Sequence, residues 1–326
     1  QINNDFLNGD EIKRKQSGLA KGTAPPTSER ITAYIDVQER MLYWIAVAWE
    51  QGFGGQVIDY GTYPEQNRQY YAYKEATRTL GRVHSGVGRL GAIYRGLLTL
   101  IDQLAVLELR DPDGSAVYRV ERLLIDAGYE KGTVFEACRD TQHGALVAPA
   151  FGRGIRAGTS PRANWAKRPG EEKGHGWIRR TAKGEGVRYL LLDANLWKTR
   201  VHHALATATG DPGSLNLYSA RPDQHQMLAD HLTAETPATT QGHGREVVEW
   251  TLHDKGRDNH WLDCLAGAAA AASLIGVSAM GDEQPNRRKQ PNERASSGDV
   301  SVEGRTSVVG GKSVFGRVWR VGGGDG

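Results

Sequence analysis

Three aspartates lie far apart in this chain, each next to a run of apolar residues. Asp36 ends ITAYID, Asp126 ends ERLLID, and Asp263 lies in NHWLDCLAGAAAAA. Carboxylate oxygens are the ligands that Mg²⁺ and Mn²⁺ prefer, and two such ions about 3.5–4 Å apart activate a water and stabilise the leaving oxygen in phosphodiester cleavage. A fold that brings the three aspartates together would therefore form a nuclease site, in which all three are metal ligands and catalytic residues.

Each aspartate also has a simpler interpretation. Asp36 precedes a polar turn and Asp126 precedes Ala-Gly, so each could cap a turn instead of binding metal. Asp263 falls in the first turns of an apolar helix, where a carboxylate is costly to bury unless it is paired or metal-bound. Asn259, one turn earlier on the same face, could assist it or simply cap the helix. The secondary candidates for the site are Asp258, Asn259 and His260.

The positive charge of the chain is concentrated in one segment. Residues 151–188 contain ten Lys or Arg and three Glu, a charge of +7, so the remainder sums to −4 within the net charge of +3. This asymmetry indicates a polyanionic partner at one site, and we expect contacts to the phosphates of double-stranded DNA. Trp165 and Trp177 could stack on bases if a strand opens; the alternative is a solvated flexible loop. The predicted DNA-binding residues are Arg153, Arg156, Arg162, Lys167, Arg168, Lys173, Arg179, Arg180 and Lys183.

The apolar patterns predict an α/β protein. We expect antiparallel strands at 31–37, 41–49 and 56–60, helices at 70–81 and 93–109, a strand at 119–126, a helix from Thr133 and a strand at 145–149. After the basic segment we expect strands at 187–192, 215–218 and 246–253, and helices at 194–207 (capped by Asp193), 223–234 and 259–275. This order resembles that of the ribonuclease H-like fold, a mixed central sheet flanked by helices. In that fold the first acid lies on the central strand and the next on a neighbouring strand.

The two ends of the chain are expected to lie outside a domain at 31–277. Residues 1–30 are polar, contain a Pro-Pro pair and lack an initiator Met, which indicates a linker or N-terminal extension within a longer polypeptide. Residues 278–326 are rich in Gly, Ser, Pro and charge, a composition typical of a flexible C-terminal tail.

The remaining composition excludes several classes of protein. Cys138 and Cys264 both lie in apolar helical patterns, as expected for free buried thiols in a reducing cytoplasm. No CxxC or HExxH motif is present, which argues against a zinc site. No apolar run reaches the length of a membrane span, so we expect no membrane partner.

Three motifs in order resemble the nuclease domain of the large terminase subunit of tailed bacteriophages, in its lambda-like branch. They are ITAYIDVQERMLYWIAVAWEQGFGGQVIDYG, LLIDAGYEKGTVFEACRD and DNHWLDCLAGAAAA, within a match that runs from residue 31 to 277. The family commonly has Glu where this chain has His260, so a fourth carboxylate is not carried over. The segment TSVVGGKS has Thr where a phosphate loop has its first Gly, so we expect no ATPase half in this chain.

The resemblance implies an endonuclease that cuts concatemeric viral DNA during genome packaging. It implies that Asp36, Asp126 and Asp263 hold two Mg²⁺ or Mn²⁺ ions, in the cytoplasm of an infected bacterium. An N-terminal ATPase domain, a small terminase subunit and a portal protein are the implied partners.

Two other functions remain open from the sequence. A Holliday-junction resolvase or transposase-like nuclease of the same fold would prefer branched DNA, whereas a terminase nuclease would cut linear or supercoiled duplex. A packaging module that binds DNA without cutting it would have purely structural acids.

Overall fold

The computed structural model describes residues 7–159, 165, 167–242, 244–254 and 256–279. Nine of the described strands form one mixed sheet in the order β11-β3-β2-β1-β6-β7-β10-β9-β8. The bounds of these strands are Arg30–Val37 (β1), Leu42–Trp49 (β2), Gly55–Tyr63 (β3), Arg122–Asp126 (β6), Val147–Arg153 (β7), Glu172–Gly174 (β8), Trp177–Thr181 (β9), Arg188–Asp193 (β10) and Leu215–Leu217 (β11). Two small ribbons pair Leu109–Arg110 (β4) with Val117–Tyr118 (β5), and Glu235–Gly242 (β12) with Arg245–Leu252 (β13).

The pairing directions give the ribonuclease H-like arrangement. Strands β1, β2 and β3 are antiparallel neighbours, whereas β6 joins the other side of β1 in parallel and β7 and β10 continue in parallel. Strand β1 therefore lies inside the sheet, where the antiparallel strands meet the parallel ones, and the predicted fold class, a mixed sheet flanked by helices, is confirmed.

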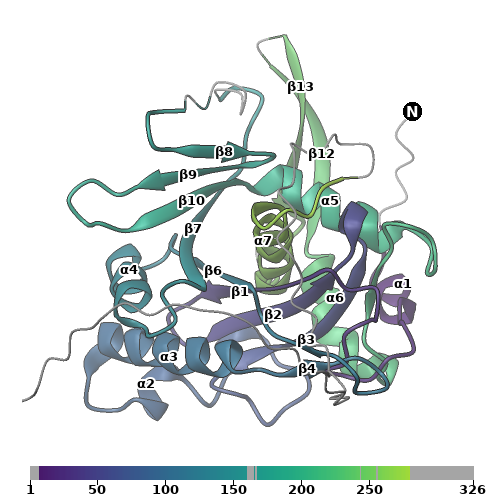
Figure 1. Cartoon of the computed structure of the whole chain (residues 1–326), viewed down its shortest axis with the longest axis horizontal. Coiled ribbons are helices and arrows are strands. Elements are labelled where there is room, and N and C mark those ends of the chain that lie inside the picture. The colour runs from purple at the N-terminus through teal and green to yellow at the C-terminus, as the bar shows by residue number, and fades with distance from the viewer. Residues whose placement is uncertain (1–6, 160–164, 166, 243, 255, 280–326) are drawn as a thin grey trace, which may run out of the picture. The chain divides into compact units, whose positions relative to one another are not determined.

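Helices cover both faces of the sheet (Figure 1). Their bounds are Gly9–Arg14 (α1), Leu80–Val83 (α2), Gly88–Ala105 (α3), Lys131–Asp140 (α4), Ala194–Ala206 (α5), Gln226–Leu232 (α6) and His260–Leu274 (α7), with short 3₁₀ turns at Gln51–Phe53, Tyr73–Glu75 and Pro222–His225. The α7 face of β1 carries Tyr34, and the α3 face carries Ile35 and its alternate neighbours. Because both faces are buried, β1 is an almost continuous apolar run.

Small residues let α7 lie close against β1. A Cβ atom on Gly267 would lie 2.1 Å from ring carbons of Tyr34, so only glycine fits there. The hydroxyl of Thr32 donates to the backbone oxygen of Ala268 at 2.8 Å, which fixes the register of the helix on the strand. This contact places the first turns of α7, with Asp263, beside the end of β1.

The prediction that residues 1–30 form a linker is wrong for residues 7–30. Helix α1 begins with a capping box between Asn8 and Glu11, and Ile12 is buried against the main core. Farther along, Gln16 forms a bridge with Leu217, so the segment adds backbone pairing to the sheet. A few apolar side chains, Leu7, Ile12 and Ala24, together with backbone hydrogen bonds fix a segment that is otherwise polar.

Several local predictions also differ from the structure. The helix expected at 70–81 is replaced by a 3₁₀ turn and α2, because Gln66 and Asp258 accept the backbone N–H groups of Thr77, Arg78 and Tyr73. The helix expected at 223–234 divides into a 3₁₀ turn and α6, and β8, β9 and β12 were not predicted. By contrast, Asp193 caps α5 as predicted, accepting from the backbone N–H of Leu196 at 3.2 Å.

The cysteines, the C-terminal residues and the helix lengths were also predicted from the sequence. Cys138 and Cys264 are free and buried, as expected. The expected C-terminal tail falls, from residue 280 onward, outside the described residues. None of the helices in the described part of the chain is long and apolar enough to cross a membrane.

Candidate acidic site at the carboxyl ends of the strands

The fold brings the three predicted aspartates to one cleft. Asp36 is next to last in β1 and Asp126 is last in β6, and the pairing of Ile35 with Ile125 aligns the two parallel strands at their carboxyl ends. Asp263 enters from the first turn of α7. Together they line a cleft of about 340 Å³ whose walls also include Lys198. Open α/β sheets place their sites at this edge, which agrees with the position expected from the sequence.

Asp36 is held by two side-chain donors. Its Oδ2 atom lies 2.8 Å from Nδ1 of His260 and accepts from Nε2 of Gln38 at 3.0 Å. Burial alone would lower the pKa of His260, but the hydrogen bond and charge of Asp36 outweigh it and raise the pKa. His260 also stacks on Tyr43 with ring centroids 4.3 Å apart, so its imidazole is fixed in place. The residue that stands where the family commonly has Glu is thus a hydrogen-bonding partner of Asp36.

The carboxyl of Asp126 has a strongly raised pKa. Burial, followed by the charge of Asp36, raises the pKa of Asp126 to about 7. Its Oδ1 atom accepts from the backbone N–H of Gly128 at 3.1 Å, which partly offsets the rise. Asp126 therefore caps the turn at Gly128 and also lines the cleft, so the two interpretations from the sequence are compatible. A cleft that raises the pKa of a carboxyl this far favours the approach of positive charge.

Asp263 belongs to a buried polar network that the sequence did not reveal. Nζ of Lys198 lies 2.8 Å from Asp263 Oδ1 and 2.5 Å from Glu235 Oε1. Asn259 donates to the same Glu235 oxygen at 2.5 Å and to Asp263 Oδ2 at 3.2 Å. Burial opposes charge on Lys198, yet Asp263 and Glu235 raise the pKa of Lys198 above its ordinary value. Burial also raises the pKa of Asp263, which the charge of Lys198 partly offsets.

A sequence signal for Lys198 existed in the helix pattern. The residue lies between buried Trp197 and Val201 on α5, and a lysine on such a face needs a partner. Its partner Glu235 is 37 residues away, at the start of the unpredicted strand β12, so no local pattern connected them.

The secondary candidates have distinct places. Asn259 precedes α7 but makes no side-chain cap hydrogen bond, so the capping role is wrong, and its amide instead bridges Glu235 and Asp263. Asp258 accepts the backbone N–H of Tyr73 at 2.7 Å and does not line the acidic cleft. Among the described residues, no group of three or more His, Cys, Asp and Glu side chains is arranged to bind a metal ion as it stands.

The predicted DNA-binding segment divides between two faces of the sheet. A cleft of about 650 Å³ is lined by Lys131, Arg153, Arg168, Arg180 and Lys183, together with aromatic side chains that include Trp165. Arg153 ends β7, one residue after Gly152, which lines the acidic cleft.

The other predicted members lie elsewhere. Trp177 is buried, with Nε1 donating to Ser273, so its predicted stacking on bases is wrong. Arg179 faces a different pocket, at the amino ends of the strands. Arg156 and Lys167 are exposed, Lys173 is exposed near the backbone oxygen of Trp165, and Arg162 lies outside the described residues.

Comparison with known families decides the identity of this domain. The family model described as "Terminase large subunit gpA, endonuclease domain" matches residues 2–285. The chain belongs to this terminase family. It is accordingly an endonuclease domain of phage DNA packaging, as the resemblance implied, and the resolvase or transposase alternative is not supported.

Solved structures of terminase nuclease domains are similar to the chain at low identity. A lysine-to-alanine mutant nuclease domain of the large terminase subunit gp2 of bacterial virus Sf6, with manganese, has 10% identity and a TM-score of 0.40, covering 80% of this chain and 97% of that one. The same mutant fragment with calcium has 10% identity and a TM-score of 0.39, with the same coverage. Among curated proteins, none matches the chain.

Proposed function

We propose that this terminase domain is a Mg²⁺- or Mn²⁺-dependent endodeoxyribonuclease that cuts concatemeric viral DNA. Asp36, Asp126 and Asp263 would hold two ions in the acidic cleft. The observation that supports this most strongly is that three elements far apart in sequence each bring a carboxylate to one cleft, where the pKa of Asp126 rises to about 7. The negative charge of three converging carboxylates is what a divalent cation neutralises.

The donor set fits hard divalent cations. All three candidate ligands are carboxylates, and no thiol lines the cleft. The contacts to His260 and Gln38 use Oδ2 of Asp36, and Asp126 accepts a backbone hydrogen bond through Oδ1. Each carboxylate oxygen has more than one lone pair, so further coordination is chemically available.

The protein groups around the cleft hold the acids in place. Bound ions would lower the pKa of a water and neutralise charge on the scissile phosphate. Lys198 orients Asp263 and balances Glu235, while His260 orients Asp36. Arg153, which lines the neighbouring basic cleft, would contact the DNA backbone, and this contact would position the duplex without reading its sequence.

We place this activity in a packaging complex within the infected bacterial cell. An ATPase domain would move the DNA, a small terminase subunit would select it, and a portal protein would receive it. The nuclease would then act on linear duplex presented by the other subunits.

Plasmid cleavage tests the proposed function. The chain is incubated with supercoiled plasmid in Mn²⁺, Mg²⁺ or EDTA, beside Asp36→Asn and the control Asp140→Asn, which alters an exposed aspartate at the end of α4. We expect metal-dependent nicking and linearisation by the wild type and the control, and none by Asp36→Asn. An intact plasmid in every lane, with DNA still bound in a gel-shift assay, would instead identify a non-catalytic DNA-binding module.

A further inference from the structure

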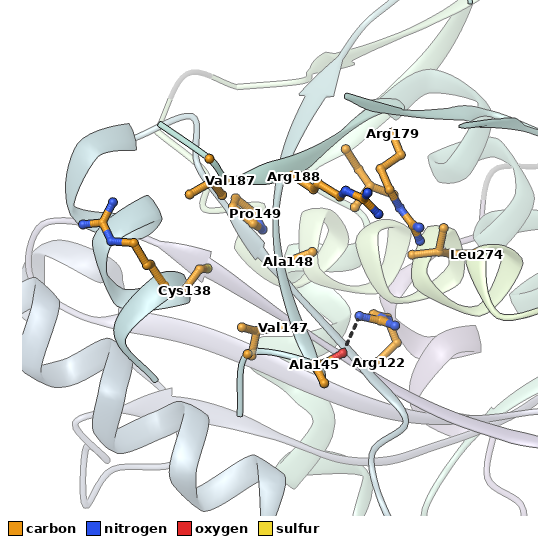
Figure 2. A pocket seen from close by; sticks show the side chains of 14 residues that line it. Arg122, Cys138, Ala145, Val147, Ala148, Pro149, Arg179, Val187, Arg188 and Leu274 are labelled. Atoms are coloured by element: carbon orange, nitrogen blue, oxygen red, sulfur yellow. Dashed lines mark hydrogen bonds between the residues drawn. The ribbon is translucent and has the colours of Figure 1, made fainter. Parts of the chain in front are cut away.

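A second pocket lies on the same sheet face as the acidic cleft, at the opposite ends of the strands. Its volume is about 370 Å³, and the described residues that line it include four arginines and no Asp or Glu. Figure 2 shows Arg122, Arg179 and Arg188 directed toward one region beside Leu274, the last residue of α7.

Strand register explains why these three arginines share a face. Leu190 of β10 pairs with Ala150 of β7 and with Arg179 of β9, and directly paired residues project to the same side of a sheet. Arg188 is two residues from Leu190, so it also projects to that side. On β6, Leu124 pairs with Ala148, which places Arg122 on this face as well.

The sheet face between the arginines is hollow because its residues are small. Ala148 of β7 lines the pocket, as do Ala145 and Gly186 in the segments that precede β7 and β10, and larger side chains at these positions would fill it. The helix above it, α7, ends at Leu274, so the space beyond the helix is covered by side chains alone. The result is a concave, positively charged surface rather than a packed core.

The arginines are only partly neutralised. Nη1 of Arg122 donates to the backbone oxygen of Ala145 at 2.9 Å, while its buried Nε has no hydrogen-bond partner among the described residues. Burial, followed by the charge of Arg179, lowers the pKa of Arg122. Arg179 pairs with Glu172 at 2.7 Å, which leaves its other guanidinium nitrogens available.

We propose that this arginine pocket binds a phosphate group. Guanidinium groups bind phosphate through paired, charge-assisted hydrogen bonds, and Arg122, Arg179 and Arg188 direct three of them toward one region of the pocket. Arg122 precedes Asp126 by four residues on one strand, a separation of about 13 Å at the usual rise. The phosphate comes either from a DNA backbone that extends past the cleft or from a free phosphate or nucleotide.

If the arginines only stabilise the end of α7, the expected result differs from that of phosphate binding. Positive side chains near the end of α7 stabilise its carboxyl-terminal dipole, and this effect does not depend on phosphate. Loss of an arginine would then lower thermal stability equally with and without phosphate. Phosphate binding is therefore measured separately from stability.

Titration calorimetry with inorganic phosphate, at constant ionic strength, tests the proposal. Arg188→Gln removes an exposed guanidinium from the pocket, and Ala148→Leu fills the pocket without changing charge. Arg119→Gln is the control, since it removes an exposed arginine that pairs with Glu108 outside the pocket. We expect both pocket variants to lose at least about tenfold in phosphate affinity, as for one charge-assisted hydrogen bond, and the control to match the wild type.

Duplex DNA binding at several salt concentrations identifies the source of the phosphate. If the DNA backbone occupies the pocket, Arg188→Gln lowers DNA affinity and reduces the salt slope by about one. If a free phosphate or nucleotide occupies it, DNA affinity is unchanged although phosphate affinity falls. The proposal is overturned if Arg188→Gln and Ala148→Leu both bind phosphate and duplex DNA with the same affinities as the control Arg119→Gln. None of these measurements requires cleavage, so a failed nuclease assay leaves the test intact.

Discussion

Removal of the Lys198 ammonium is the most direct test of the buried network. Lys198→Met keeps the length and apolar stem of the side chain but leaves Glu235 and Asp263 without their cation. Breaking a buried ion pair by removing one partner costs about 3–5 kcal/mol. In a domain of this size 1 kcal/mol lowers Tm by about 2–4 °C, which gives a range of about 6–20 °C. Because 38% of the Asp263 side chain is exposed, water replaces part of the lost partner, and we expect the lower half of this range.

The assay is thermal unfolding followed by circular dichroism. Lys21→Met is the matched control, because Lys21 forms an ion pair with Asp59 at 3.0 Å but has 56% of its side chain exposed. Because water already solvates the Lys21 ammonium, its removal should lower Tm less than removal of the buried Lys198 ammonium. The double variant Lys198→Met/Glu235→Gln also removes the negative charge of Glu235, which Lys198→Met leaves buried without a cation. The double variant should therefore be more stable than Lys198→Met.

Two results would refute this reasoning. Equal Tm losses in Lys198→Met and Lys21→Met would mean that burial of the network contributes nothing beyond an ordinary surface pair. The second result is additivity: the Tm loss of the double variant equals the sum of the losses of Lys198→Met and Glu235→Gln measured separately. That result would mean that the two side chains are not coupled.

Three further predictions follow from the same structure. Millimolar Mg²⁺ or Mn²⁺ should raise the Tm of the wild type but not of Asp126→Asn, because only a folded carboxylate cleft binds the ion; an unchanged wild-type melt would contradict the metal site. Gly267→Ala should lower the free energy of unfolding in urea by at least about 1–3 kcal/mol, since its Cβ would meet the Tyr34 ring at 2.1 Å, whereas Gly81→Ala, with open space around it, should cost nothing. Burial lowers the pKa of His202 to about 4, from an ordinary value of 6.5, so the unfolded chain takes up this proton first as pH falls. That linkage removes up to about 3 kcal/mol of the free energy of unfolding between about pH 6.5 and 4. Urea unfolding at these two pH values should therefore show a smaller loss of stability in His202→Gln than in the wild type.

The parts of the fold that could be predicted were those with a strong local signal. Runs of apolar and small residues identified β1, β2 and β10, and the side chain of Asp193 marked the start of α5. The segment at 7–30 was missed because it contributes only a few scattered apolar side chains, Leu7, Ile12 and Ala24, and backbone pairing, which leave its composition polar. The hairpin of β8 and β9 was missed because charged residues dominate its sequence.

The sequence by itself determined the three aspartates, their places at strand and helix ends, and the order of elements that brings two of them onto neighbouring parallel strands. These are local properties, since each depends on a residue and its immediate neighbours. Tertiary structure alone decided which nitrogen-bearing side chains contact the acids: Lys198 reaches Glu235 and Asp263, and His260 reaches Asp36. It also placed alternate residues of one basic segment on opposite faces, with Arg179 in the arginine pocket and Arg180 in the cleft behind it. The physical reason is that pairing partners and strand register depend on contacts between distant segments, and a shift of one residue moves a side chain to the other face.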